Sequence, residues 1–179
     1  MGMQYDVSSV HLNSSGACYV GRTRLKGIAL VGTATAGTLN LWDSTVAPTA
    51  ATYARSGYTV TVTKTAHGLV VGQQVGITFS VAGGVSATNG NYTIATTPDA
   101  DTFTITDINT GTVAALTVCN YVASPLGNNL SPWLTSMDTA AVTGGAQTIF
   151  FNPPGEGLVC HQGLWATFSN MTGLTVFYG

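Results

Sequence analysis

The chain has 179 residues, of which 7% are charged, with five Lys and Arg against seven Asp and Glu. A soluble domain is usually about 25% charged, yet the 45% of hydrophobic residues excludes a disordered polar tract. The net charge of −2 argues against nucleic acid as a partner, because such binding needs a basic surface that releases counterions. No apolar run approaches the roughly 20 residues of a transmembrane helix, so we expect no membrane partner.

Sparse charge is the first indication of function. A compact monomer of this size exposes roughly 8,000 Å² of surface, and so few charged residues leave most of it uncharged. Proteins with so little surface charge tend to associate, so we expect the chain to work inside an assembly. The alternative is a monomer kept soluble by its Thr, Ser and Asn side chains.

Secondary structure is predicted to be β throughout. Thr, Val, Ile and aromatic residues fill the ordered stretches, and Gly and Asn clusters separate them. Residues 1–17, rich in Ser and Asn, are predicted to form an N-terminal arm. A strand is expected over residues 18–31, followed by a turn and a return strand over residues 38–43.

Three basic residues alternate in the first predicted strand: Arg22, Arg24 and Lys26. A period of two places them on one face, with Thr23 and Leu25 on the other. A basic strand face suits an acidic partner, so the three are candidate interface residues. The alternative is a solvated edge that prevents unwanted strand pairing.

Residues 44–56 are predicted to be a linker, because a proline stands there among small residues. Five predicted strands follow within about 65 residues, which suggests a small barrel or meander. They cover residues 58–64, 73–81, 91–97, 101–107 and 112–122. Further strands are expected between residue 148 and the end of the chain.

The strands on either side of this run are too few for separate cores but together suffice for one sandwich. We therefore predict an all-β fold, with a β-sandwich or jelly-roll-like domain formed by residues 18–46 and 123–179. A small β-barrel or meander module is inserted at residues 47–122. Such insertions are tolerated at exposed loop tips because the core of the host domain stays intact.

Three separated blocks of the module form a pattern: residues 65–75 (TAHGLVVGQQV), 89–94 (NGNYTI) and 98–105 (PDADTFTI). In this order they resemble a small β-module that recurs in virion proteins of tailed bacteriophages. That module often has Gly-Asp where Gln73-Gln74 stands here. The flanks look like a small jelly-roll subunit of phage heads and tails, in residues 25–28, 37–43, 163–165 and 174–178.

The resemblance implies a structural virion protein without catalysis, assembled in the host cytoplasm. It favours a head decoration or cement protein that binds the major capsid protein and copies of itself, with a homotrimer expected by analogy. The alternative is a tail, neck or fibre-associated protein whose inserted module binds glycans.

No catalytic site or cofactor is expected. His67 invites a Ser/His/Asp interpretation, but no Gly-x-Ser-x-Gly elbow accompanies it. We expect His67 instead to cap backbone groups at a turn. The single glutamate, Glu156, lies in a Pro-Pro-Gly-Glu-Gly turn without an evident carboxylate partner for glycoside hydrolysis.

No metal site is expected either. Cys160 and His161 are adjacent, so on a strand they point to opposite faces. The oxygen atoms of Asp99, Asp101 and Asp107 are of the kind that binds calcium. Aspartates in a Pro-Asp-Ala-Asp stretch, however, more often bond their own backbone to form the turn.

Trp133 is the fourth candidate interface residue. It lies in a predicted loop, and exposed aromatic residues dominate many interfaces; sugar stacking and core packing are the alternatives. The cysteines, Cys18, Cys119 and Cys160, are odd in number and far apart. We expect them to be reduced, buried thiols, as is usual in a cytoplasm.

Overall fold

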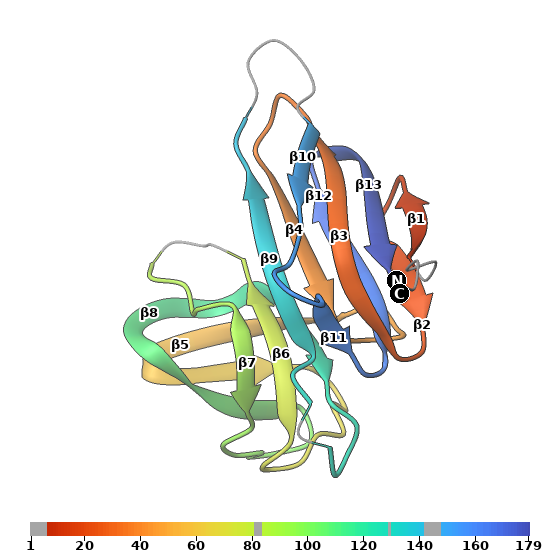
Figure 1. Ribbon diagram of the computed structural model, residues 1–179. Coiled ribbons are helices and arrows are strands. Elements are labelled where there is room, and N and C mark those ends of the chain that lie inside the picture. Colours follow the sequence, from red (N-terminus) through yellow and green to blue (C-terminus); the bar gives the residue numbers. More distant parts are fainter. Residues whose placement is uncertain (1–6, 81–83, 129, 142–147) are drawn as a thin grey trace. The chain divides into compact units, whose positions relative to one another are not determined.

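The computed structural model describes residues 7–80, 84–128, 130–141 and 148–179 (Figure 1). Within these ranges every regular element is a β-strand in an antiparallel sheet, and none is a helix that could cross a bilayer. The predicted all-β fold class is therefore confirmed. The chain divides into two compact units, Met1–Ala47 with Leu134–Gly179, called the sandwich here, and Pro48–Trp133, called the module.

Two sheets make up the sandwich. The first has the strand order β1 (Ser8–Leu12), β13 (Met171–Tyr178), β3 (Thr23–Gly32) and β10 (Thr148–Phe151), with β11 (Leu158–Cys160) also paired to β3. The second has the order β2 (Gly16–Val20), β12 (Gly163–Ser169), β4 (Gly37–Trp42) and β9 (Trp133–Thr139).

The core of the sandwich takes buried side chains from both sheets, which is why the sheets pack face to face. In β4 these side chains recur every second residue, as alternation in a half-buried strand requires. In β3 the alternation shifts by one residue at Gly27, where two adjacent residues are buried. The fully buried members are Leu25, Leu30, Leu39, Leu41, Cys160, Leu164, Ala166, Leu174 and Val176.

The predicted arm is corrected by the structure. Residues 8–12 form β1, which pairs with β13 from Ser8↔Tyr178 to Leu12↔Leu174, and residues 16 and 17 begin β2. The prediction rests on the Ser-rich composition and does not weigh Val10 and Leu12. These two apolar side chains pack against the core and hold β1 in the sheet. The first six residues of the predicted arm lie outside the described residues.

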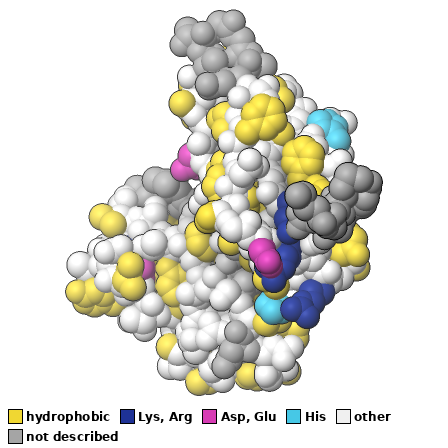
Figure 2. Space-filling view, in the orientation of Figure 1, with side chains coloured by type: hydrophobic (Ala, Val, Ile, Leu, Met, Phe, Trp, Pro, Cys, Tyr) yellow, Lys and Arg dark blue, Asp and Glu magenta, His cyan; other side chains and the backbone are white. Residues whose placement is uncertain are grey.

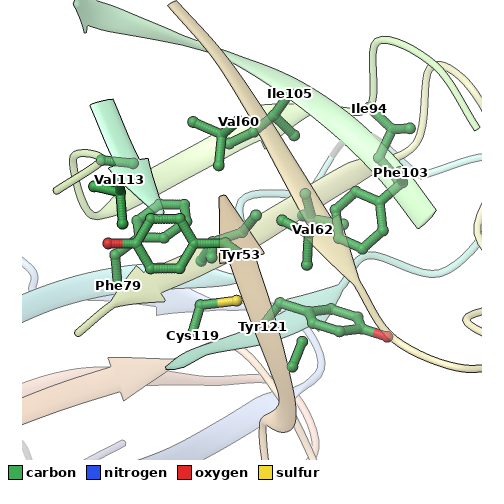
Figure 3. Close-up of a cluster of buried hydrophobic side chains, with 14 residues drawn as sticks. Tyr53, Val60, Val62, Phe79, Ile94, Phe103, Ile105, Val113, Cys119 and Tyr121 are labelled. Carbon is green, nitrogen blue, oxygen red and sulfur yellow. The ribbon is translucent and has the colours of Figure 1, made fainter. Parts of the chain in front are cut away.

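The module is one sheet that nearly closes into a barrel, with the order β5 (Thr49–Thr63), β8 (Thr102–Ala123), β6 (Gln74–Phe79) and β7 (Gly90–Thr93). Figure 1 shows β5 and β8 as long curved strands, which pair from Thr49↔Tyr121 to Thr63↔Thr102. A bridge between Thr96 and Thr104 helps to close the sheet. Inside, the Tyr53 and Phe79 rings meet edge to face at 4.8 Å between centroids (Figure 3).

Two expectations for the module are wrong. Residues 49–56 continue β5 instead of forming a linker, because Ala51, Tyr53 and Arg55 alternate inward among the small residues. Residues 101–107 and 112–122, expected as two strands, belong to a single β8 that continues through the bend between them.

The unit boundaries also differ from the expected 47–122. Residues 123–133, expected in the sandwich, belong to the module as far as they are described. Trp133 explains the difference, because its backbone N–H and C=O bond the Asn91 side chain at 2.8 and 2.7 Å. Residues 129 and 142–147 of the expected sandwich segment, and residues 81–83 of the module, lie outside the described residues.

Candidate functional site

The basic residues of β3 and the bend before it form a stripe on the sandwich. Arg22 is exposed and Arg24 and Lys26 are half-buried, whereas Thr23 and Leu25 between them are buried. Figure 2 shows Lys and Arg side chains gathered on one face of this unit, next to an acidic side chain. The stripe follows from the period of two in an antiparallel strand with one buried face.

A cavity of about 250 Å³ lies at the stripe, lined by Arg22, Thr23, Arg24, Val159 and Gly179. β11 provides one wall, because Val159 pairs with Arg24. The Arg24 guanidinium lies 3.5 Å from the Glu156 carboxylate, and both side chains are exposed enough for solvent to screen the pair. Exposed ion pairs of this kind stabilise little, so the stripe keeps most of its capacity to bind an acidic surface.

The buried carboxylate of Asp43 fixes the turn that follows β11. It accepts hydrogen bonds from the backbone N–H groups of His161 at 2.8 Å, Gln162 at 2.7 Å and Gly163 at 3.2 Å. Burial, and then the negative charge of Asp43, raise the pKa of the nearby Cys160 thiol to about 12. Asp43 thus positions one wall of the cavity at the basic stripe. Its charge also helps to keep the Cys160 thiol protonated and unreactive.

The first and third blocks of the sequence pattern meet in one turn cluster of the module. His67 Nδ1 accepts from the Leu69 N–H at 3.0 Å, so its Nε2 carries the proton and donates to the carbonyl oxygens of Thr102 at 3.1 Å and Asp99 at 3.2 Å. The ring also packs edge to face on Phe103. All ring nitrogens are therefore engaged with backbone, which is the capping role expected from the sequence.

Aspartates of the same cluster also bond backbone. Asp99 accepts from the Asp101 N–H and Asp101 accepts from the Ala66 N–H, both at 2.8 Å. The Asp101 N–H, and then the Thr102 hydroxyl, hold the pKa of Asp99 below its usual value. In the described part of the chain, no three His, Cys, Asp or Glu side chains are placed to hold a metal ion.

Arg55 and Asp107 form an ion pair inside the module that the sequence did not predict. Their nearest side-chain atoms lie 3.0 Å apart and both side chains are 0% exposed. Asp107 also accepts from the Thr88 N–H at 2.9 Å. Burial raises the pKa of the Tyr92 hydroxyl, and the negative charge of Asp107 raises it further. The pair leaves no free charge for binding or catalysis.

Trp133 is half-buried and fixed rather than free in a loop. Besides its two bonds to Asn91, its backbone passes so close to Gly76 that a Cβ there would lie 2.5 Å from the Trp133 nitrogen. Only a glycine fits at that point of β6. Trp133 belongs to the module and the basic stripe to the sandwich, so we treat the predicted interface residues as two separate candidates.

Both units expose large apolar side chains. In the module they include Tyr58, Val71, Ile108 and Leu126, and in the sandwich Phe150 is 72% exposed. The sequence did not predict them, because alternation indicates which residues face a core but not which apolar residues outside the core stay uncovered. The chain matches no protein-family model and no curated protein sequence. The function must therefore be inferred from the site itself. Its main features, a basic stripe and exposed apolar side chains, are those of surfaces that contact other proteins.

Proposed function

We propose that this chain is a structural virion protein of a tailed phage, a head decoration or cement protein that binds and reinforces the capsid lattice. The observation that carries the proposal is how the polar and apolar groups are distributed. Buried charges are engaged internally, while large apolar side chains stand exposed on a chain that is only 7% charged. Such a surface suits an assembly in which neighbouring chains cover it.

The basic stripe gives the sandwich a candidate orientation on the shell. Arg22, Arg24 and Lys26 would face an acidic patch of the major capsid protein, where complementary charge guides docking. A β-sandwich with a buried core provides a rigid base for this contact. Copies of the chain, a homotrimer in our proposal, would cover the apolar surface that remains.

Binding to purified capsids tests the stripe. Replacing Arg22 and Lys26 together by Glu should weaken capsid binding, most strongly at low salt, because exposed charges are screened as ionic strength rises. Lys64→Glu in the module is the matched control, since it makes the same kind of change away from the stripe. Equal binding by the double variant and the control would remove the stripe from the mechanism.

Copy number in the virion tests the role itself. A decoration protein occurs in a number set by the capsid lattice, and particles lacking it lose resistance to heat. A number set by one ring, or a position at the tail vertex, would instead favour the tail, neck or fibre role. The turn cluster supports that second candidate, because Asp99 and Thr97 line a cavity of about 490 Å³ with polar groups suited to a glycan.

A further inference from the structure

Three exposed apolar side chains stand where β5 and β8 bend, and we call them the knob: Tyr58, Val85 and Ile108. They are 56%, 58% and 81% exposed. Figure 2 shows hydrophobic side chains over this bend. Exposed apolar side chains that lie together, unlike single ones, mark candidate contact surfaces.

The buried ion pair lies directly beneath the knob. Arg55 donates to the carbonyl oxygens of Gly57 and Val85, both at 3.2 Å, and to that of Asn109. Each carbonyl belongs to a knob residue or to its neighbour in sequence. A buried pair costs desolvation and adds little stability by itself, but this one fixes three segments at once. The knob is therefore held rigid before any partner arrives, which lowers the entropy lost on binding.

Charge in the module lies away from the knob. Among the described residues, the exposed carboxylates of Asp99 and Asp101 lie in the turn cluster, where the Lys64 N–H donates to the Asp101 carbonyl at 2.8 Å. The charges near the knob, Arg55 and Asp107, are wholly buried and neutralise each other. A partner that covers the knob would have no charge to desolvate, so an apolar, uncharged surface fits it best.

A surface of that kind exists on the same module, and we call it the hollow. It has a volume of about 240 Å³ and is lined by residues 70–73 and 125–128, none of them charged. Val70, Val71 and Leu126 are 47%, 60% and 67% exposed. An apolar cavity of about 150 Å³ can hold a benzene-sized molecule, so the hollow has room for a branched side chain or a ring.

Gln73 holds the two walls of the hollow together. Its side chain accepts from the Val70 N–H at 3.2 Å and donates to the Ser124 carbonyl at 2.7 Å. The Ser124 hydroxyl in turn donates to the Asn128 carbonyl at 2.7 Å. Like the knob, the hollow is fixed from beneath by side-chain hydrogen bonds to backbone.

Knob and hollow lie at opposite ends of the β6–β8 ladder. Its register runs from Val75↔Ala123, next to the hollow, to Phe79↔Cys119. Beyond Phe79 the chain reaches Gly84, which bridges to Val113 beside the bend. One copy therefore presents an exposed apolar surface at one end and a concave, uncharged surface at the other.

We propose that Ile108 of one copy's knob enters the hollow of the next copy, so that the modules contact one another head to tail. The inference rests on the assembly role proposed above and names the partner of the module as a second copy of this chain. Contacts between two different surfaces repeat, and they close a ring or extend a row. The contact is small and therefore weak in solution, and many copies held on a lattice would strengthen it.

Sedimentation of the full chain at up to about 1 mM, where weak contacts are populated, tests the contact. Ile108→Asp should weaken self-association at least about 30-fold, as at an interface hot spot, and Val71→Asp should do the same from the other side. Val118→Asp is the matched control, because Val118 is an exposed valine on β8 outside both surfaces. Thermal unfolding of each variant verifies that it is folded.

A mixture of the two defective variants gives the decisive result. Ile108→Asp retains an intact hollow and Val71→Asp an intact knob, so the mixture should form heterodimers and nothing larger. No association in the mixture, or an equal loss in Val118→Asp, overturns the proposal. A wild-type chain that stays monomeric overturns it as well. None of these results touches the capsid-binding and copy-number tests, so the assembly role would stand or fall separately.

Discussion

The sandwich buries the carboxylate of Asp43 without a cation, whereas the module buries Arg55 and Asp107 as a pair. Asp43 needs only the three N–H groups of one turn, because those groups converge on a single carboxylate. The guanidinium of Arg55 has five diverging donors, so it takes carbonyls from separate segments as well as a counter-charge. One charge thus fixes a turn, and the other fixes a whole end of a barrel.

Buried cysteines allow the two units to be followed separately. Cys119 belongs to the core of the module, and Cys18 and Cys160 to that of the sandwich. Burial raises the pKa of each thiol to about 12. Because the thiolate is the reactive form, each cysteine should react with a thiol reagent only when its own unit opens.

The largest effect is expected at the ion pair of the module. Arg55→Met leaves Asp107 buried without a partner, which should lower the free energy of unfolding of the module by about 3–5 kcal/mol. Urea unfolding monitored by Cys119 labelling measures the loss, and labelling of Cys18 should be unchanged.

The double variant Arg55→Met with Asp107→Leu is the control, because it removes both charges. It should recover a large part of the stability, since an apolar pair often replaces a buried ion pair without loss. A double variant as unstable as the single one would show that Arg55 acts through its bonds to carbonyls and not through its charge.

Substitution of Asp43 should destabilise the sandwich in the same way. Asp43→Ala leaves three backbone N–H groups without their acceptor and should cost about 2–3 kcal/mol, less than the full sum because solvent reaches the turn. Cys18 and Cys160 should become reactive at lower urea, while Cys119 should not. Labelling of all three together would contradict the separation of the units that the comparison assumes.

These two sites mark what the sequence could and could not predict. The basic stripe and the core of β3 and β4 were predictable because their signal, alternation, lies within one strand. Asp43 and Arg55 were not, because apart from Asp107 their partners are backbone atoms of turns up to 120 residues away, which carry no side-chain pattern. The length of β5 was missed for a different reason, since the inward set includes the charged Arg55 and the outward set includes apolar Ala54, so burial does not follow hydropathy.

The turn cluster was predicted in part. The blocks around His67 and Asp99 signalled turns, and the capping role of the imidazole followed from the absence of any catalytic partner. The backbone groups that the imidazole caps could not be predicted, because residues 67 and 102 come together only when the barrel closes. Nothing in the sequence indicated the knob and the hollow, because residue type alone does not distinguish an exposed valine from a buried one.

A smaller effect is expected at His67. His67→Ala removes an acceptor for the Leu69 N–H and a donor for two carbonyls, but the cluster is largely exposed and water can replace part of this. We expect a loss of about 1–2 kcal/mol in the module alone. His67→Gln, which keeps one donor and one acceptor, should lose less. Urea unfolding of both variants measures the difference, and equal losses would mean that ring packing on Phe103 matters more than the hydrogen bonds.

The smallest effect compares one residue in each unit that has a positive φ without being glycine. Ala66 in the module has φ 51° and Asn170 in the sandwich has φ 54°. Alanine has no side-chain group that favours this left-handed conformation, whereas asparagine adopts it readily and here also donates to the Ala36 carbonyl at 2.8 Å. The same substitution should therefore have opposite effects in the two units.

Ala66→Gly removes a backbone penalty of about 1–2 kcal/mol and adds unfolded-state entropy worth about 0.4–1 kcal/mol. It keeps the bond from the residue 66 N–H to Asp101, so the module should gain roughly 0.5–1 kcal/mol. Asn170→Gly has less penalty to remove and loses a hydrogen bond, so the sandwich should lose about 1 kcal/mol. Urea midpoints followed at Cys119 for the first variant and at Cys18 for the second measure the two signs. If both variants lose stability, entropy of the unfolded chain, not local conformation, dominates at these turns.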